Sequence, residues 1–207
     1  MSSTIYPTSY EPGVGMETQR DGAVRAGVRL WHVEHKGAVV SAYLDIETAF
    51  DGSITVIGVF RPDFGTIQLV GGGVTDVNIY RALEGITTIY TYNGGSFDLP
   101  VIRRRLRVDL KQDFQHHDLM RDCWKQGLKG GLKKVELTIG IARGTAGLSG
   151  WDAPRLWYRY ETKGDQAALE LLLRYNRDDV INLPRLRAYL HKLPEEPLRE
   201  ETIVWQA

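Results

Sequence analysis

Two carboxylates stand two residues apart at the end of an apolar run. Asp45 and Glu47 close the stretch from Val39 to Glu47, which is filled by Val, Ala, Tyr, Leu and Ile, a composition typical of a buried strand. Residues i and i+2 of a strand point to the same face, so both acids are expected side by side. Buried like charges repel unless a partner is present, and hard oxygen ligands suit Mg²⁺ or Mn²⁺. The simpler interpretation is that the strand has ended and both acids are solvated.

A third acid, Asp98, follows a predicted strand over residues 86–92 and a glycine-containing turn, and a helix to about residue 106 comes next. Open α/β sheets bind ligands at such strand ends. Asp98 or Ser96 could instead cap the helix, since both residue types are favoured there. For Asp98 taken alone, capping is the simpler interpretation.

Tyr175 and Asp179 are four residues apart on a long helix predicted over 165–190. This spacing places both side chains on one helix face. Taken separately, Tyr175 could be a packed aromatic whose hydroxyl is satisfied, and Asp179 could belong to a solvated face shared with arginines. Asp178 points in another direction and is expected to lie in solvent.

The order of predicted elements indicates an α/β architecture. Strands over 39–46, 53–60 and 66–70 are joined by short turns and predict a three-stranded antiparallel meander. Helices over 76–84, 98–106, 132–138 and 165–190 then alternate with strands over 86–92 and 115–119. We therefore expect a mixed sheet with antiparallel first strands, flanked by helices.

The chain is expected to contain a single domain with two extensions. Residues 1–25 are predicted to form an irregular N-terminal arm, residues 26–193 the domain, and residues 194–207 a C-terminal tail. A strand over 25–34, expected at an edge of the sheet, spans the boundary between the arm and the domain.

Composition limits the cellular context and the partners. The single cysteine, Cys123, cannot form an internal disulfide, which fits a cytoplasmic protein, and no apolar run approaches the roughly 20 residues of a membrane span. Net charge is zero, with 26 Lys+Arg and 26 Asp+Glu. Residues 103–143 nevertheless hold eleven Lys or Arg against five Asp or Glu, so a local basic surface for nucleic acid is compatible with the sequence.

A strand D-x-E, a turn N-x-x-x-F-D and a helical Y-x-x-x-D occur in this order, and together they resemble the DEDD superfamily of 3′–5′ exonucleases, in the branch with tyrosine in the third motif. The pattern is most similar to the YprB-type ribonuclease H-like group, which is related to the exonuclease domain of family B DNA polymerases. It spans roughly residues 39–190, and the matching strings are Tyr43–Thr48, Tyr92–Asp98, His117–Leu119, Leu132–Glu136 and Tyr175–Val180. The resemblance implies a ribonuclease H-like fold.

The resemblance also implies residue roles. Asp45 would bridge two Mg²⁺ or Mn²⁺ ions, Glu47 and Asp179 would complete the ion on the nucleophile side, and Asp98 would serve the leaving-group side. Tyr175 would orient the attacking water, because a phenol with a pKa of about 10 is a poor base at neutral pH. The implied reaction releases 5′-mononucleotides from a 3′ end of DNA or RNA.

Four residues are expected to contact the substrate, a single-stranded 3′ end: Asn93, Phe97, Arg103 and Arg104. Phe97 could stack on a terminal base, and the two arginines could follow the phosphate backbone. The alternatives left open are that Phe97 packs into the core and that the arginines belong to an ordinary solvated helix face.

Asp118 is expected to be structural. A non-catalytic nucleic-acid-binding module and an endonuclease are the alternative functions, and a protein partner or a homo-oligomer is also left open.

Overall fold

The computed structural model describes residues 41–194 and 200–206. The chain divides into two units, Met1–Trp31 and His32–Ala207, and all described residues belong to the second. The expected N-terminal arm and the edge strand at 25–34 lie outside the described residues.

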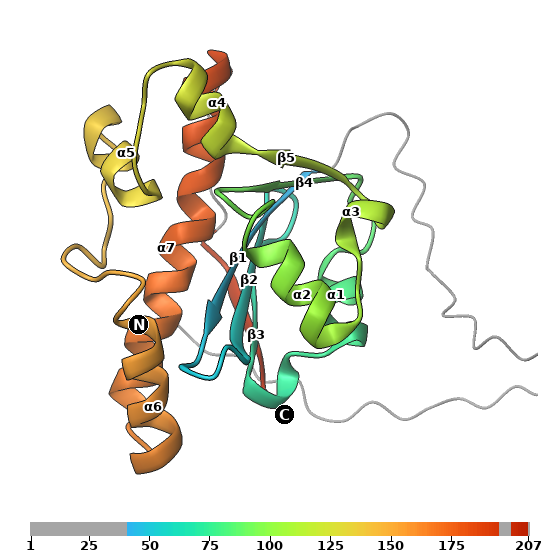
Figure 1. The fold of residues 1–207 in the computed structure, drawn as a ribbon, viewed down its shortest axis with the longest axis vertical. Helices are drawn as coiled ribbons and strands as arrows, with labels where there is room; N and C mark the ends of the chain where they lie inside the picture. Colours follow the sequence, from blue (N-terminus) through green and yellow to red (C-terminus); the bar gives the residue numbers. More distant parts are fainter. Residues whose placement is uncertain (1–40, 195–199, 207) are drawn as a thin grey trace, which may run out of the picture. The chain divides into compact units, whose positions relative to one another are not determined.

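Six strands form one mixed sheet in the order β5-β4-β1-β2-β3-β6 (Figure 1). The first three strands pair antiparallel, as the sequence predicts, while β4 is parallel to β1, β5 to β4 and β6 to β3. The strand bounds are β1 Ser41–Thr48, β2 Ile54–Arg61, β3 Gly65–Val70, β4 Thr88–Thr91, β5 Gln115–Asp118 and β6 Thr202–Gln206.

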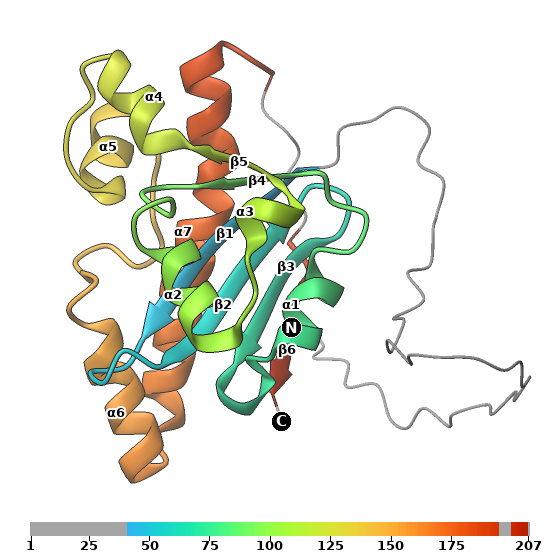
Figure 2. The same ribbon diagram turned by 45° about the vertical axis from the view of Figure 1, so that its right-hand side comes forward.

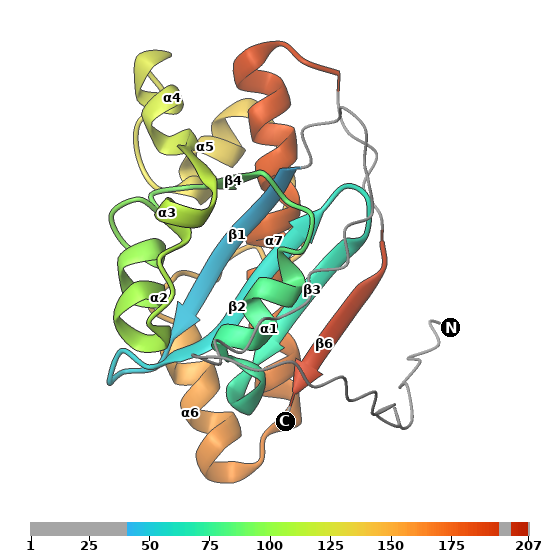
Figure 3. The same ribbon diagram turned by 90° about the vertical axis from the view of Figure 1, so that its right-hand side faces the viewer.

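Helices cover both faces of the sheet (Figures 2 and 3). Figure 3 looks onto the face that carries α1 and α2, with α7 behind the sheet. None of the described helices is both long and apolar enough to cross a lipid bilayer. The helix bounds are α1 Asp76–Ala82, α2 Asp98–Leu106, α3 Leu110–Asp113, α4 Leu119–Lys125, α5 Leu132–Ile139, α6 Ala153–Lys163 and α7 Gln166–His191, with a 3-10 turn at Gly71–Gly73.

Alternation along β1 decides which side chains face which helices. Ala42, Leu44 and Ile46 pack with the apolar residues of α1 and α2, whereas Tyr43 packs with α4, α5 and α7. Because successive strand residues point to opposite faces, Asp45 and Glu47 lie on the α7 side together with Tyr43. This placement is the one that the i, i+2 spacing predicts.

The long helix α7 approaches the sheet closely at Gly58 of β2. Gly58 lies between Asp45 of β1 and Gln68 of β3 in the strand register. A Cβ atom at Gly58 would lie 2.3 Å from Oδ1 of Asn176 on α7. The absence of a side chain therefore lets the helix bring its polar residues down to the middle of the sheet.

Three helices and one strand were not predicted from the sequence. α3, α4 and α6 have no counterpart among the predicted helices, and residues 202–206, expected to be part of a tail, instead form β6 at the edge of the sheet. The segment Thr202-Ile-Val-Trp-Gln has strand-like composition, but only pairing with β3 makes so short a segment stable.

The substitution Gly58→Ala should destabilise the protein by about 1–3 kcal/mol, because the added methyl group overlaps the Asn176 amide and forces the packed helix to move. Urea unfolding monitored by circular dichroism measures this loss. Gly144→Ala is the control, since a Cβ there meets its nearest atom, a carboxylate oxygen of Asp178, at an ordinary 3.7 Å. Equal stability of the two variants would contradict the close approach.

Candidate active site

Three carboxylates from two distant segments meet at the end of β1. Asp45 and Glu47 project from the strand, and Asp179 comes from α7. One oxygen atom of each lies within 4.8 Å of the others. Glu47 and Asp179 are buried and Asp45 is half-buried, so the alternative of two solvated acids after a finished strand is wrong.

Asp98 reaches the same place from the opposite face of the sheet. Its Oδ1 accepts a hydrogen bond of 3.0 Å from the backbone N–H of Ile46. The N-cap of α2 is Phe97, which makes no side-chain capping hydrogen bond, so Asp98 does not cap the helix. Its buried carboxylate lies in the wall of a cavity of about 270 Å³ whose lining includes Asp45, Glu47, Asp98, Tyr175 and Asp179.

Burial and mutual repulsion disfavour the charged forms of these acids. Burial raises the pKa of Asp45 and of Glu47 well above the usual range, and the neighbouring Asp179 and Asp98 carboxylates raise both further. Burial also raises the pKa of Asp98 to about 7. The pKa of Asp179 is raised to about 6 by burial, although the adjacent Arg143 acts in the opposite direction.

A buried ion-pair network of Arg143 and Glu136 fixes the side chain of Asp179. Arg143 lies 2.7 Å from Oδ1 of Asp179 and 2.8 Å from Oε2 of Glu136, and all three side chains are at least nine-tenths buried. Asn182 donates a further hydrogen bond of 3.0 Å to Glu136. Sequence reasoning did not single out Arg143, and it included Glu136 in a matching string without giving it a role. The structure supplies the reason for both, because a fully buried acid needs a partner.

A chain of amides orients Asp45 across the sheet. Asn176 Nδ2 donates to Asp45 Oδ2 at 3.1 Å, and Gln68 Nε2 donates to Asn176 Oδ1 at 3.0 Å. The Gln68 amide also reaches the carbonyl of Leu173 at 2.9 Å. Both amide side chains are almost completely buried. Sequence reasoning missed both residues, because a Gln in a strand and an Asn in a helix carry no local signal. Their roles follow from the packing of α7 against β3.

Tyr175 lies beside the acids and is held by a lysine. Lys133 Nζ donates to the Tyr175 hydroxyl and to the carbonyl of Leu148, and it also lies 3.9 Å from the centre of the tyrosine ring. Burial, followed by the charges of Asp179 and Glu47, raises the pKa of Tyr175 above its usual value. The phenol is therefore neutral at physiological pH and can position a polar group but not abstract a proton.

The turn before α2 is shaped by Asp118. Its carboxylate accepts hydrogen bonds from the backbone N–H groups of Asn93 at 2.8 Å and Gly95 at 3.1 Å, as expected for a structural residue.

Two of the expected substrate residues lie in this turn. Asn93 adopts a positive φ of 64°. Asn93 and Phe97 both line the acidic cavity, and the Phe97 side chain is 47% exposed, so it does not pack into the core.

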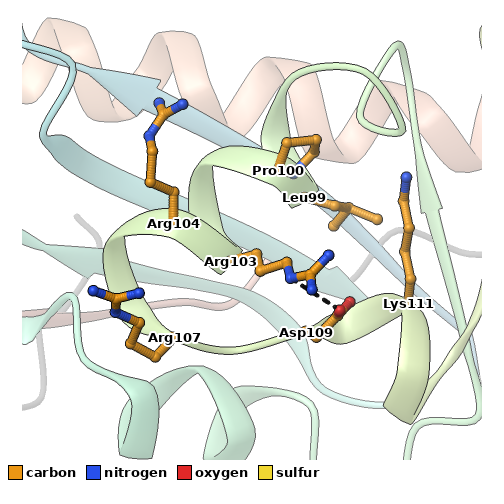
Figure 4. A pocket seen from close by; sticks show the side chains of 7 residues that line it. All are labelled: Leu99, Pro100, Arg103, Arg104, Arg107, Asp109 and Lys111. Atoms are coloured by element: carbon orange, nitrogen blue, oxygen red, sulfur yellow. Dashed lines mark ion pairs between the residues drawn. The ribbon is translucent and has the colours of Figure 1, made fainter.

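One expectation about a charged residue differs from the structure, and a second set of charged residues lies outside the acidic cavity. Asp178 is buried, and its Oδ2 accepts hydrogen bonds from the backbone N–H and hydroxyl of Thr145. The solvent position predicted for it is wrong because the 144–150 loop folds against α7. Arg103 and Arg104 line a different cavity on the outer side of α2 (Figure 4) and not the acidic one.

A family model described as the RNase_H superfamily matches residues 42–191, from β1 to the end of α7. The chain belongs to this superfamily. Its α/β sheet, with antiparallel first strands and helices on both faces, is the ribonuclease H-like fold that the sequence resemblance implied.

Two known proteins are similar to this RNase_H-superfamily chain, one in sequence and one in fold. The chain is 30% identical over 119 residues to the uncharacterized protein YprB of Bacillus subtilis (strain 168), a match that covers 52% of this chain and 28% of YprB. The fold is similar to that of the family B DNA polymerase from the hyperthermophilic archaeon Pyrobaculum calidifontis, with a TM-score of 0.55 and 18% identity, over 73% of this chain and 24% of the polymerase.

The raised pKa values predict an unusual pH dependence of stability without divalent ions. The unfolded chain has Asp pKa values near 3.9, whereas Asp98 and Asp179 have values of about 7 and about 6 when folded. The folded chain therefore binds more protons between about pH 4 and pH 7, so these groups lower the free energy of unfolding as pH rises through that range. Urea unfolding in EDTA at several pH values measures the slope.

Asp98→Asn is the matched variant, because an amide oxygen can still accept the Ile46 N–H while carrying no charge. Its stability relative to the unmodified protein should increase as pH rises from about 4 to about 7. Saturating Mg²⁺ or Mn²⁺ should reduce the difference, since ions that bind the folded carboxylates stabilise the unmodified protein. A difference that stays constant with pH would contradict the raised pKa of Asp98.

The substitution Arg143→Met should cost about 3–5 kcal/mol of stability, because it leaves the buried carboxylates of Glu136 and Asp179 without their cation. Thermal and urea unfolding measure the loss. Arg155→Met is the control: Arg155 pairs with Asp152 at 3.5 Å on the surface, where a pair contributes below about 1 kcal/mol. Similar small losses for both variants would show that the buried network does not stabilise the fold.

Proposed function

We propose that this chain is a metal-dependent 3′–5′ exonuclease of the DEDD superfamily, in its tyrosine branch, acting on DNA or RNA. The observation that carries the proposal is one cavity lined by Asp45, Glu47, Asp98, Asp179 and Tyr175, the acid set and the tyrosine of the resemblance. Membership in the RNase_H superfamily supports nuclease chemistry.

The acids fit divalent cations. Carboxylate oxygens of Asp45, Glu47 and Asp179 lie close enough to share one ion, and Asp98 lies across the same cavity. The choice of Mg²⁺ or Mn²⁺ follows from the all-oxygen ligand set. When bound, two such ions would neutralise the scissile phosphate, lower the pKa of the attacking water and stabilise the leaving oxygen.

The remaining residues of the cavity bind and orient. The neutral Tyr175 hydroxyl, held by Lys133, positions the attacking water. Asn176 keeps Asp45 in its ligand orientation, and Arg143 does the same for Asp179. Phe97, exposed at the cavity, offers a ring face on which a terminal base can stack, and Asn93 contacts the same terminal nucleotide. Arg103 and Arg104 contact the backbone of the strand outside the cavity.

Two alternatives use the same fold. An endonuclease would cut within a strand, and a non-catalytic module would bind nucleic acid without hydrolysing it. The second alternative is disfavoured because such modules usually lose one of the acids, while here the carboxylates line one cavity and remain strongly repulsive without a cation. Association with a protein partner or a second copy stays a prediction.

Hydrolysis of a 5′-labelled single strand in Mg²⁺ or Mn²⁺ tests the proposal. The unmodified protein should shorten the strand stepwise from its 3′ end and leave circular single strands intact. Asp45→Asn should lower the rate at least about 10³-fold, since several kcal/mol of transition-state stabilisation depend on the ions. The exposed Asp76→Asn on α1 should have no effect.

Three outcomes would contradict the proposal in different ways. Equal degradation by the unmodified protein and Asp45→Asn would place the chemistry elsewhere. Cutting of circles would favour the endonuclease. No hydrolysis by either protein, together with no heat of cation binding by calorimetry, would favour the non-catalytic module.

A further inference from the structure

The outer side of α2 carries a second cavity, of about 320 Å³, which is lined mainly by cationic residues (Figure 4). Its charged lining residues are Arg103, Arg104, Arg107, Lys111 and Asp109. All four cations are exposed. The cavity therefore offers four positive charges and one negative charge in a chain whose net charge is zero.

The positive charge of this cavity is only partly neutralised by the protein. Asp109 lies 3.2 Å from Nε of Arg103, and Figure 4 shows the side chains of Arg104 and Arg107 extending away from that pair. Across residues 41–194 and 200–206, neither Arg104 nor Arg107 takes part in an ion pair. Two guanidinium groups are thus available for an external anion.

Helix α2 connects this cationic cavity directly to the acidic one. Asp98, its first residue, lines the acidic cavity, whereas the next two residues, Leu99 and Pro100, line the cationic cavity. Lys111 Nζ also donates a hydrogen bond of 2.8 Å to the carbonyl of Gly95, in the turn that enters α2. With a rise of about 1.5 Å per residue, Arg104 lies about 9 Å along the helix from Asp98 and Arg107 about 13 Å, a separation of a few nucleotides.

Electrostatics explains why a strand needs cations here. A phosphate that approaches buried carboxylates is repelled wherever bound ions do not neutralise them. A strand whose end enters the acidic cavity must therefore gain its affinity from phosphates further along. Arg is suited to this contact, because its guanidinium binds phosphate oxygens in a bidentate manner and independently of base sequence.

We propose that Arg104 and Arg107, with Arg103 and Lys111, form a phosphate-binding subsite for the uncleaved part of a single-stranded nucleic acid whose 3′ end occupies the acidic cavity. The assignment rests on the proposed exonuclease function and adds to it a requirement for strand length. Stabilisation of the C-terminal end of α2 by its arginines accounts for their position on the helix, but it gives no dependence of binding on strand length or salt.

Binding of fluorescent oligothymidylate and oligouridylate, measured by anisotropy in EDTA at several salt concentrations, tests the subsite without any hydrolysis. The double variant Arg104→Glu/Arg107→Glu should weaken binding of a long strand about tenfold or more. Loss of two phosphate contacts should also reduce the slope of log K against log salt by about 1.4, because each contact on a single strand contributes about 0.7. Binding of a dinucleotide should not change.

Two further variants separate charge from folding and from position. Arg104→Gln/Arg107→Gln should show the same direction with a smaller effect, while Arg104→Lys/Arg107→Lys should retain most of the affinity. Arg81→Glu/Lys163→Glu makes the same change in net charge on α1 and α6, at exposed positions, and should leave the salt slope unchanged. Circular dichroism confirms that each variant is folded.

The subsite is overturned if the unmodified protein does not bind the long strand, or if the α2 variants and the α1/α6 control behave alike. An equal loss for the dinucleotide would also overturn it, because the contact would then lie at the strand end. Failure of the exonuclease proposal is a separate result: hydrolysis would be absent while length-dependent binding persisted.

Discussion

Four carboxylates face one partly desolvated cavity, and the rest of the site must hold them there against their mutual repulsion. Asp45, Glu47 and Asp179 place oxygen atoms within 4.8 Å of one another, and Asp98 faces the same space. Burial raises every one of their pKa values. A fold gains nothing in stability from such an arrangement, which supports the proposed cation site.

Neighbouring polar groups hold the acids in place without removing that repulsion. The Arg143–Glu136 pair anchors Asp179, the Asn176 and Gln68 amides anchor Asp45, and the main chain of Ile46 anchors Asp98. Each support is itself buried or comes from the backbone, so the acids have fixed directions. Supports of this kind generally decide how precisely a metal site is formed.

One strand and one helix carry most of this arrangement. β1 lies between β4 and β2, where both sheet faces are covered, and α7 crosses the sheet over Gly58 and brings Tyr175, Asn176 and Asp179 to one end of β1. α2 then links the acidic cavity to a cationic surface. A single helix thus joins an acidic region to a cationic region, as the proposed binding of a single strand by its 3′ end requires.

The sequence by itself determined the meander, the alternating elements that follow it and the side-by-side projection of Asp45 and Glu47, because strand and helix periodicity are local properties. It also indicated which distant acids belong together, through the order of the motifs. The position of Asp98 followed only from that order, since capping is the more common role of an acid there, and the burial of Asp178 could not be inferred because such a residue is usually solvated. β6 was missed because a five-residue strand is stabilised by its partner and not by its own propensity.

Only the tertiary structure decided which residues support the site and where the arginines of α2 lie. Arg143, Glu136, Asn176 and Gln68 gain their roles from contacts between segments that are far apart in the chain, and no local pattern encodes such contacts. Arg103 and Arg104 were recognised as a basic cluster, but the direction of α2 places them outside the acidic cavity. Side-chain types and their spacing can be read from the sequence, whereas the burial of these side chains and the pairing of their charges arise only when α7 and α2 pack against the sheet.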